Sequence, residues 1–393
     1  MEFVKQYWAP LVCGLVIVGV LPLIVGYVVL VERKIMADMQ ARLGPMRVGP
    51  HGLLQPIADA VKLLIKEDII PEEADKMVFW LAPVLSVAAA LLAIAGLAIG
   101  PAFQIAKDVN IGILFVVGVS AMGIFGIVLG GWASNSHYSL IGALRSSAQL
   151  VSYETAAGMA LVCGLLFAGS LNITSIVQAQ YDQGVWFGLL APVAFFTYLV
   201  ASIAETNRAP FDLPEAESEL TAGFHTEYSG FRWSLFFLAE YSAMIAVSSI
   251  AVTLWLGGWM RPFPHWLTGE TWDLVFSLFP GVTFVLLALI TFYSTIRMPK
   301  HPYFRVQTIG LAGFGAVLGL IGLLLFVPPV RDRIQDIYWF AVKVAGFMYL
   351  YIWYRGTFPR YRFDQLMKVG WKVLLPIGLG VLIVTGILGV VLS

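Results

Sequence analysis

The sequence predicts an all-α protein that crosses a membrane about ten times. Of its 393 residues, 59% are hydrophobic and only 12% are charged, and the mean hydropathy is +0.83. Soluble domains carry roughly 25% charged residues. Apolar runs of about 20 residues, long enough to cross the hydrocarbon core as helices, recur along the whole chain. The alternating ten-residue segments of a membrane β-barrel are absent from the sequence.

The first apolar run is a membrane span and not a cleaved signal peptide, because Glu32-Arg33-Lys34 follows it in place of a small-residue cleavage site. The remaining spans follow from the apolar runs in chain order. The ten expected spans lie at about 11–31, 78–99, 111–132, 151–171, 185–204, 233–256, 274–296, 306–327, 338–354 and 372–391.

Basic residues orient these spans. Most Lys and Arg residues fall in one set of loops, and loops rich in Lys and Arg stay in the cytoplasm. Both termini are therefore expected on the outer, periplasmic side. The whole chain carries 24 basic and 24 acidic residues, so its charge gives no basis for binding nucleic acid. The outer loops and the N-terminal tail carry only Lys5, Lys107, Arg261, Arg331 and Arg333.

The first cytoplasmic loop, residues 32–77, contains an amphipathic segment. Its apolar residues approach the i, i+3, i+4, i+7 pattern of a helix with one apolar face. Asp59, Lys62 and Lys66 occupy the other side. This pattern predicts a helix that lies along the cytoplasmic membrane surface, and in its simplest interpretation it is an interfacial anchor. The apolar residues are Leu53, Leu54, Ile57, Ala58, Val61, Leu64 and Ile65.

Residues 204–223 form a loop rich in carboxylates, in which Arg208 is the only cation. Carboxylates one helical turn apart raise each other's pKa, so such a cluster can exchange protons near neutral pH. The alternative is a solvated acidic loop, against which stand the apolar and stiff residues Pro210, Phe211, Leu213 and Pro214. The carboxylates are Glu205, Asp212, Glu215, Glu217 and Glu219, and Glu227 lies just beyond.

Three further observations concern carboxylates within or at the ends of spans. Glu240 lies eight residues past Arg232, which places it roughly 12 Å deep in a helix. Glu154 begins the fourth span and Glu205 ends the fifth. Ionisable groups at such depth are functional candidates by default. The alternative is a structural hydrogen bond to a neighbouring helix. Together these groups suggest a line of protonatable sites that leads from the cytoplasmic surface to mid-membrane.

Motifs for redox cofactors and for metals are missing from the sequence. It contains no GxGxxG before a helix and no P-loop, and its two cysteines, Cys13 and Cys163, lie separately in apolar runs. The five histidines show no ligand spacing. No motif therefore indicates bound nicotinamide, flavin, an iron–sulfur cluster or a metal.

Four segments stand out as long ordered motifs. They are ERKIMADMQARLGPMRVGPHGLLQPIADAVKLLIKED (32–68), GGWASNSHYSLIGALRSSAQLVSYE (130–154), the carboxylate loop continued to GFHTEYSG (223–230), and RGTFPRYRFDQLMKVGWKVLL (355–375). They resemble the H subunit of the proton-pumping NADH:quinone oxidoreductase, respiratory complex I. The resemblance covers the chain except about 272–335.

The resemblance implies a function for these segments. In this family the first cytoplasmic loop and the carboxylate loop form the membrane side of a quinone chamber, which the peripheral arm completes. Quinone chemistry is coupled there to proton translocation. The chamber residues implied are Gln40, Arg42, Arg47, Asp59 and Phe224. The coupling residues implied are Glu154, Glu205, Arg208, Asp212, Glu215, Glu217, Glu219, Glu227 and Glu240, with Arg145 near the entrance.

The resemblance also implies the molecular setting. The quinone, ubiquinone or menaquinone, is a substrate, while NAD, FMN and the iron–sulfur clusters lie in partner subunits. The partners are the other membrane subunits, the peripheral arm and lipid, in a bacterial inner membrane. The isolated chain has no catalytic residue of its own, because the complex is the enzyme.

The chain departs from the eight-span pattern of the family after Gly257-Gly258-Trp259. Two extra spans, joined by the basic segment RMPKHPYFR (297–305), are expected in residues 272–335. The first six spans would then occupy 1–271 and the last two 336–393. We expect the inserted hairpin at the edge of the subunit, against lipid or another subunit.

Two other functions remain open from the sequence. One is the equivalent subunit of a relative that takes electrons from ferredoxin, a deazaflavin or hydrogen. The other, of a different class, is a free-standing ion transporter. The sequence shows no inverted repeat and no paired broken spans, which are typical of transporters.

Overall fold

The computed structural model describes residues 2–101, 103–104, 109–212, 222–263, 265–297 and 305–392. Most of the described chain is helical. The elements are α1 (Glu2–Met39), the 3-10 turn η1 (Pro50–Gly52), α2 (Gln55–Ile65), α3 (Lys76–Gly96), β1 (Ala98–Gly100), β2 (Phe103–Gln104), α4 (Gly112–Ala121), α5 (Gly123–Ala133), α6 (His137–Ala168), α7 (Ile173–Gln183), α8 (Phe187–Leu190), α9 (Pro192–Glu205), the 3-10 turn η2 (Gly223–His225), α11 (Gly230–Trp255), α12 (Glu270–Arg297), α13 (Arg305–Leu324), α14 (Pro328–Thr357), α15 (Phe363–Val369), the π-helical η4 (Gly370–Leu374) and α16 (Leu375–Leu392).

The all-α prediction is confirmed. Within the described residues, eight helical segments are long and apolar enough to cross a membrane. The expected spans at 185–204 and 338–354 correspond to α9, which has only 14 residues, and to α14, which is long but less apolar. The sequence did not predict the short antiparallel pair β1–β2, which follows α3.

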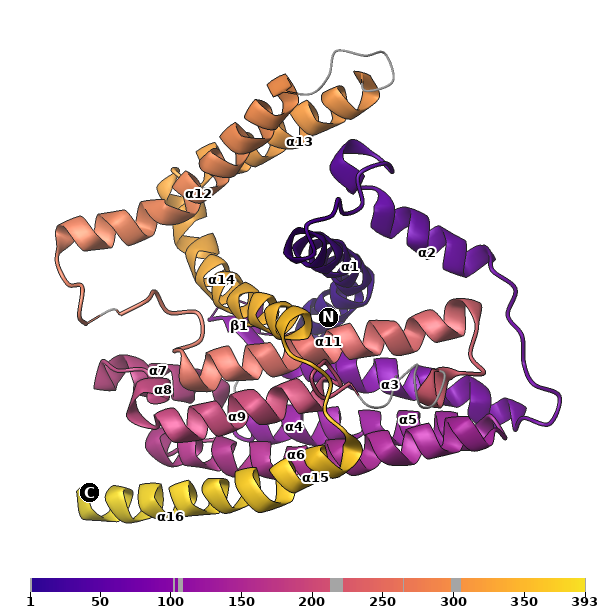
Figure 1. Cartoon of the computed structure of the whole chain (residues 1–393). Coiled ribbons are helices and arrows are strands. Elements are labelled where there is room, and N and C mark those ends of the chain that lie inside the picture. Colours follow the sequence, from indigo (N-terminus) through magenta and orange to yellow (C-terminus); the bar gives the residue numbers. More distant parts are fainter. Residues whose placement is uncertain are drawn as a thin grey trace.

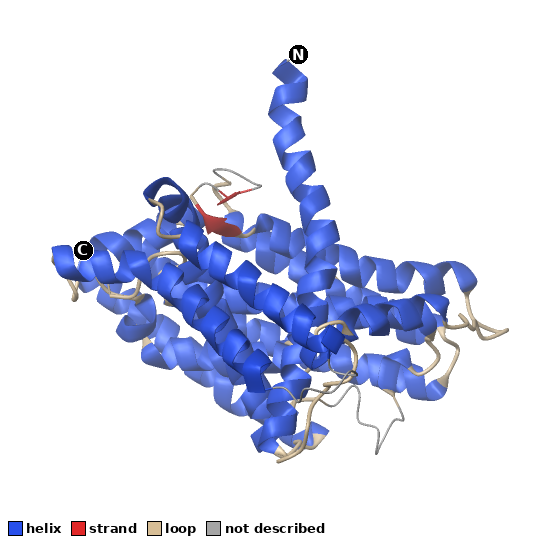
Figure 2. Ribbon diagram, turned by 90° about the horizontal axis from the view of Figure 1, so that it is seen from above, coloured by secondary structure: helices blue, strands red, loops and turns tan. Residues whose placement is uncertain are grey.

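The main bundle consists of α3, α4, α5, α6, α9 and α11, which run side by side in Figure 1, with α16 along one side. Figure 2 shows that the N-terminal end of α1 extends beyond the other helices. Small residues allow close packing, as expected where lipid removes most of the hydrophobic drive for association. A Cβ on Gly126 of α5 would lie 2.1 Å from Ser86 Oγ, and one on Gly131 would lie 2.3 Å from Ala143 Cβ.

Hydrogen bonds between helices hold distant parts of the bundle together. Tyr198 of α9 donates to the Val247 carbonyl of α11 at 3.0 Å, and Tyr153 of α6 donates to the Leu366 carbonyl of α15 at 2.9 Å. Both tyrosines are buried, and each bond satisfies a hydroxyl group that water cannot reach.

Helix α11 is held at both ends. At its start, Arg232 forms an ion pair with Asp68 at 3.1 Å and lies 3.9 Å from the centre of the Trp80 ring. At its end, Lys343 of α14 donates to the carbonyls of Leu256, Gly258 and Met260 at 2.7, 3.0 and 2.7 Å. These carbonyls belong to the C-cap residue Leu256 and to the turn that follows it, so Lys343 fixes the backbone just beyond the end of α11.

Helices α12 and α13 form the expected hairpin, which projects away from the bundle in Figure 1. The two helices meet through glycines: a Cβ on Gly281 would lie 3.2 Å from the Gly322 carbonyl oxygen. The hairpin is attached to α14, where Thr283 and Tyr338 share a hydrogen bond of 2.9 Å and Phe279 stacks on Trp339.

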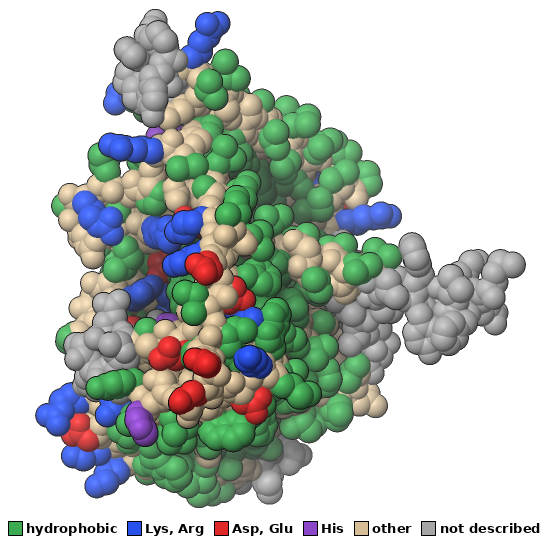
Figure 3. Space-filling view, turned by 90° about the vertical axis from the view of Figure 1, so that its right-hand side faces the viewer, with side chains coloured by type: hydrophobic (Ala, Val, Ile, Leu, Met, Phe, Trp, Pro, Cys, Tyr) green, Lys and Arg blue, Asp and Glu red, His purple; other side chains and the backbone are tan. Residues whose placement is uncertain are grey.

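The predicted amphipathic helix is α2. It packs against α1, since a Cβ on Gly26 would lie 3.1 Å from Pro56 Cβ. Its apolar face is exposed, as at Ile57, Val61 and Leu64. Figure 3 looks onto the end of the molecule where α2 lies, and charged side chains gather there beside a broad hydrophobic surface. An exposed apolar face next to charged side chains suits a helix at a membrane surface.

Candidate functional site

A buried charge cluster lies where α1, α11, α14 and the residues after α9 meet. Arg208 binds two carboxylates at once: its Nη1 lies 3.0 Å from Glu32 Oε1 and its Nε 3.0 Å from Glu240 Oε1. Glu32 also accepts hydrogen bonds from the Tyr241 hydroxyl at 2.7 Å and from Arg355. We call these five residues the charge cluster.

Burial makes these interactions strong. The side chains of Arg208 and Glu32 are 6% and 4% exposed, and that of Glu240 is 19% exposed. Burial alone would lower the pKa of Arg208, but the carboxylates of Glu240 and Glu32 outweigh it and raise this pKa above its ordinary value. Arg208 is therefore a permanent cation shared between two acids, and its guanidinium carbon lies 4.1 Å from the centre of the Tyr241 ring.

The start of the carboxylate loop is tied to the segment that joins α14 and α15. Arg360 donates to Asp212 at 3.0 Å, the Tyr361 amide donates to the Pro210 carbonyl at 3.0 Å, and Phe211 stacks on Tyr361. Asp212 is close enough to Glu240 to repel its carboxylate. The charge of Asp212 therefore contributes to the electrostatic environment of Glu240.

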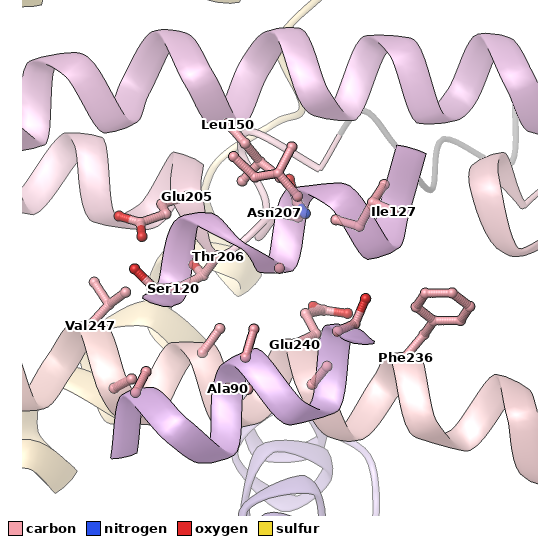
Figure 4. A pocket seen from close by; sticks show the side chains of 18 of the residues that line it. Ala90, Ser120, Ile127, Leu150, Glu205, Thr206, Asn207, Phe236, Glu240 and Val247 are labelled. Atoms are coloured by element: carbon pink, nitrogen blue, oxygen red, sulfur yellow. The ribbon is translucent and has the colours of Figure 1, made fainter. Parts of the chain in front are cut away.

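A cavity of about 110 Å³ opens next to the charge cluster. Glu154, Glu205 and Glu240 line it among mostly apolar side chains from α3, α4, α5, α6, α9 and α11. Figure 4 shows Glu205 and Glu240 among the lining residues, with Leu150 of α6 on one side and Ala90 of α3 on the other. A cavity needs roughly 10–15 Å³ to hold one water molecule, so this one has room for several water molecules. We call it the carboxylate cavity.

Two of these carboxylates interact with each other. Glu154 and Glu205 both line the cavity, and the charge of Glu154 disfavours a charge on Glu205. Gln149 fixes the end of α9 beside them, because its amide donates to the Ala204 carbonyl at 2.8 Å. Glu240 belongs to both the cavity and the charge cluster, so it joins the two.

His225 also lines the cavity, from η2, against the rings of Phe224 and Trp233. Burial lowers the pKa of His225 to about 4. The imidazole is therefore neutral near pH 7.

Comparison with known proteins assigns the family. The family model described as NADH dehydrogenase matches residues 12–386. The chain is 60% identical to NADH-quinone oxidoreductase H subunit 1 of Koribacter versatilis (strain Ellin345), over 99% of this chain and 93% of the relative. It is 53% identical to H subunit 2 of Solibacter usitatus (strain Ellin6076), over 99% of both chains, and 42% identical to H subunit 1 of that organism, over 99% and 98%.

The chain belongs to the H-subunit family of NADH-quinone oxidoreductase. It is thus a multi-pass membrane subunit of complex I, its partners include other subunits of this complex, and quinone is the substrate of the enzyme. The resemblance of the four motifs is confirmed. A free-standing ion transporter does not agree with this membership.

The expected quinone-chamber residues lie in two separate parts of the structure. Gln40, Arg42 and Arg47 lie exposed on the loop between α1 and η1, where Arg42 donates to Gln40 at 2.6 Å. Asp59 of α2 binds Arg33 of α1 at 2.9 Å. Phe224 lies apart from them: it is buried on the bundle side, packs against Phe236 and lines the carboxylate cavity.

Among the expected coupling residues, the structure brings Glu154, Glu205 and Glu240 to one cavity and joins Arg208 to Glu240. Arg145 lies on α6 over the Phe363 ring, 5.8 Å from its centre, and Glu227 lies in the turn between η2 and α11. Glu215, Glu217 and Glu219 fall within residues 213–221, outside the described residues.

The sequence did not single out Glu32, Arg355 and Arg360 as site residues. Glu32 is separated from Arg208 by 176 positions and from Arg355 by 323. In the sequence, Glu32 reads as part of the charged stop after the first span. The one signal that could have found it was a carboxylate directly after an apolar run, within a motif shared with the family.

The lowered pKa of His225 predicts the behaviour of His225→Gln in the intact complex. We expect this variant to leave the pH dependence of quinone reductase turnover unchanged between about pH 6 and 8, where the imidazole is already neutral. Steady-state turnover in membranes across this range is the measurement. A variant that removes a titration near pH 7 from the activity profile would contradict this account.

The same variant has a predicted effect on stability. The folded protein binds a proton at His225 less readily than the unfolded chain does, because burial lowers this pKa from 6.5 to about 4. The unfolded chain is therefore favoured progressively as the pH falls from 6.5 toward 4, and the protein loses stability over this range. Thermal melts of the purified complex from about pH 7 to 4.5 would show a smaller acid loss in His225→Gln than in the parent. Identical acid losses in the two proteins would show that His225 titrates normally in the folded complex.

Proposed function

We propose that this H subunit forms the membrane side of the quinone chamber and couples quinone reduction to proton translocation through its carboxylates. One observation carries the proposal: Glu240 takes part both in the charge cluster and in the carboxylate cavity. A charge change at the cytoplasmic loops therefore has a continuous electrostatic path to Glu205 and Glu154. Other carboxylates would extend this path toward the quinone, namely Asp212, Glu215, Glu217, Glu219 and Glu227.

The coupling follows from a shared cation. Reduction of a quinone to a quinol takes up two electrons and two protons, so it changes the charge balance at the chamber. Arg208 divides its attraction between Glu32 and Glu240. When one carboxylate gains a proton, its attraction to Arg208 weakens and Arg208 interacts more strongly with the other carboxylate. The two acids therefore titrate as a coupled pair. Quinone turnover can in this way bias the protonation of Glu240, and through the cavity that of Glu205 and Glu154.

The exposed first cytoplasmic loop supports the chamber part of the proposal. The side chains of Gln40, Arg42 and Arg47 are solvent-exposed, which leaves them accessible to the quinone head group and to the peripheral arm. NAD, FMN and the iron–sulfur clusters would lie in the partner subunits. We place the chain in a bacterial inner membrane with both termini periplasmic, and with ubiquinone or menaquinone as substrate.

The test is Glu205→Gln in membranes that contain the whole complex, assayed for quinone reduction and proton translocation after assembly is verified on a native gel. We expect normal assembly, because Gln has nearly the same shape, and a loss of coupled turnover of at least tenfold, which corresponds to about 1.4 kcal/mol in the barrier. Asp182→Asn is the matched control, because Asp182 is an exposed carboxylate on α7 that does not belong to the lining of the cavity. Unchanged turnover and pumping in Glu205→Gln would refute the proposal.

A further inference from the structure

The inserted hairpin contacts the loop that is proposed to bind quinone. A Cβ built on Gly310 of α13 would lie 2.5 Å from Cγ of Pro50, the first residue of η1. Real Cβ atoms do not approach that closely, so the backbone of α13 touches the Pro50 ring and only glycine fits there. Figure 1 shows the beginning of α13 near the η1 turn, which precedes α2.

The same turn is also held by α1. Lys34 donates to the His51 carbonyl at 2.6 Å. The turn itself has little freedom: His51 and Gly52 have φ angles of 48° and 77°, and a Cβ on Gly52 would lie 2.3 Å from the Pro45 carbonyl oxygen. A displacement of Pro50 therefore moves the neighbouring backbone as well, including Arg47 three residues before it.

The hairpin is a firm support because it is fixed elsewhere. Its other helix, α12, bonds to α14 through Thr283 and Tyr338 and stacks on Trp339. Helix α14 in turn carries Arg355, which binds Glu32 of the charge cluster. The hairpin thus connects the η1 turn to the helix that supplies part of the charge cluster.

We propose that the hairpin α12–α13 is a brace that positions the quinone-binding loop, with Gly310 as the positioning residue that sets the place of Pro50 and, through it, of Arg47. This inference rests on the proposed function of the loop as the membrane side of the quinone chamber. It assigns the insertion a part in substrate binding, in addition to the contact with lipid or another subunit expected for a peripheral hairpin.

The first experiment compares Gly310→Leu with Gly313→Leu in membranes that contain the whole complex. Gly313 lies one turn further along α13, where no described residue comes within 4 Å of a built Cβ, so it controls for the cost of leucine in this helix. Gly310→Leu is expected to raise the KM for quinone by at least roughly fivefold with kcat within twofold, whereas Gly313→Leu leaves both unchanged. Pro50→Ala removes the ring atom that the leucine side chain meets. In the double variant Pro50→Ala with Gly310→Leu, the KM for quinone is expected to fall most of the way back to the parent value.

A second variant tests the contact directly, whether or not Gly310→Leu assembles. The distance of 3.7 Å from a built Cβ at position 310 to Pro50 Cβ fits the Cβ separation of a disulfide. The pair Pro50→Cys and Gly310→Cys is therefore expected to cross-link in oxidised membranes, with the KM for quinone within twofold of that of the reduced pair. Digestion and mass spectrometry of the linked peptide would detect it, and Gly313→Cys with Pro50→Cys should not cross-link.

The outcomes separate the two proposals. Failure of the 50–310 pair to cross-link, or a Gly310→Leu complex whose KM equals that of Gly313→Leu, would overturn the brace. A fall in kcat alone that Pro50→Ala does not relieve would also overturn it. Arg47→Ala reports on the chamber itself: a raised KM in that variant with no effect of Gly310→Leu refutes the brace and leaves the chamber standing. Unchanged KM in Arg47→Ala removes the chamber role of this loop.

Discussion

Replacement of Arg208 by alanine is expected to destabilise the protein by about 3–5 kcal/mol, the usual effect of removing one partner from a buried ion pair. Glu240 would lose the cation that contacts it, and Glu32 would keep Arg355, whose side chain is 39% exposed. Two acids would then face each other in a buried site. The yield of assembled complex on a native gel and its melting temperature measure the effect.

Two further variants sharpen this result. Arg331→Ala removes an arginine that pairs with the adjacent, exposed Asp332, and is expected to change stability by no more than about 1 kcal/mol. In Arg208→Met with Glu240→Gln, both charges of one pair are gone, so part of the loss should be recovered relative to Arg208→Met alone. An Arg208→Ala complex that assembles and melts like the parent would show that the charge cluster contributes little to the fold.

Gly126→Val is expected to prevent α3 and α5 from packing. The added Cβ would lie 2.1 Å from Ser86 Oγ and 2.8 Å from the Ala82 carbonyl oxygen. The backbone atom cannot rotate away, so the helices must separate, and overpacking of this kind typically costs about 1–3 kcal/mol and occasionally more. Ser86 also lines the carboxylate cavity, so the same displacement would alter the proposed proton path.

The amount of the protein in washed membranes and the melting temperature of the complex would measure the effect of Gly126→Val. Gly118→Val, in the neighbouring helix α4, is the matched control because no described residue lies within 4 Å of a Cβ built there. Equal losses in the two variants would mean that β-branching in the helix, rather than the α3–α5 contact, causes the defect.

The sequence predicted the helices well because hydropathy is a local property. The runs at 274–296 and 306–327 correspond to α12 and α13, and the stripe from Leu53 to Ile65 corresponds closely to α2. The span at 185–204 was less well predicted, since the chain breaks there into α8 and the 14-residue α9 at Pro192. Proline after a short helix interrupts the backbone bonding that a continuous span needs.

The candidate site was predictable only in part. Glu240, Glu205 and Glu154 stood out because carboxylates are rare in apolar runs, a signal carried by each residue alone. The residues that bind them could not be predicted in the same way, because Glu32 and Arg355 come together with Arg208 only when α1 and α14 pack against α11. Likewise the contact of Gly310 with Pro50 joins segments that no local pattern relates.

The fixation of α11 at both ends has a consequence for how the protein can move. Arg232 ties the start of this helix to Asp68, and Lys343 holds the carbonyls beyond its last turn. These contacts oppose a shift of α11 along its axis, so we expect Glu240 to keep a nearly constant position along that axis. Under the proposed coupling role, we therefore expect movement in side chains and in the segment around Arg208, with α11 staying in place.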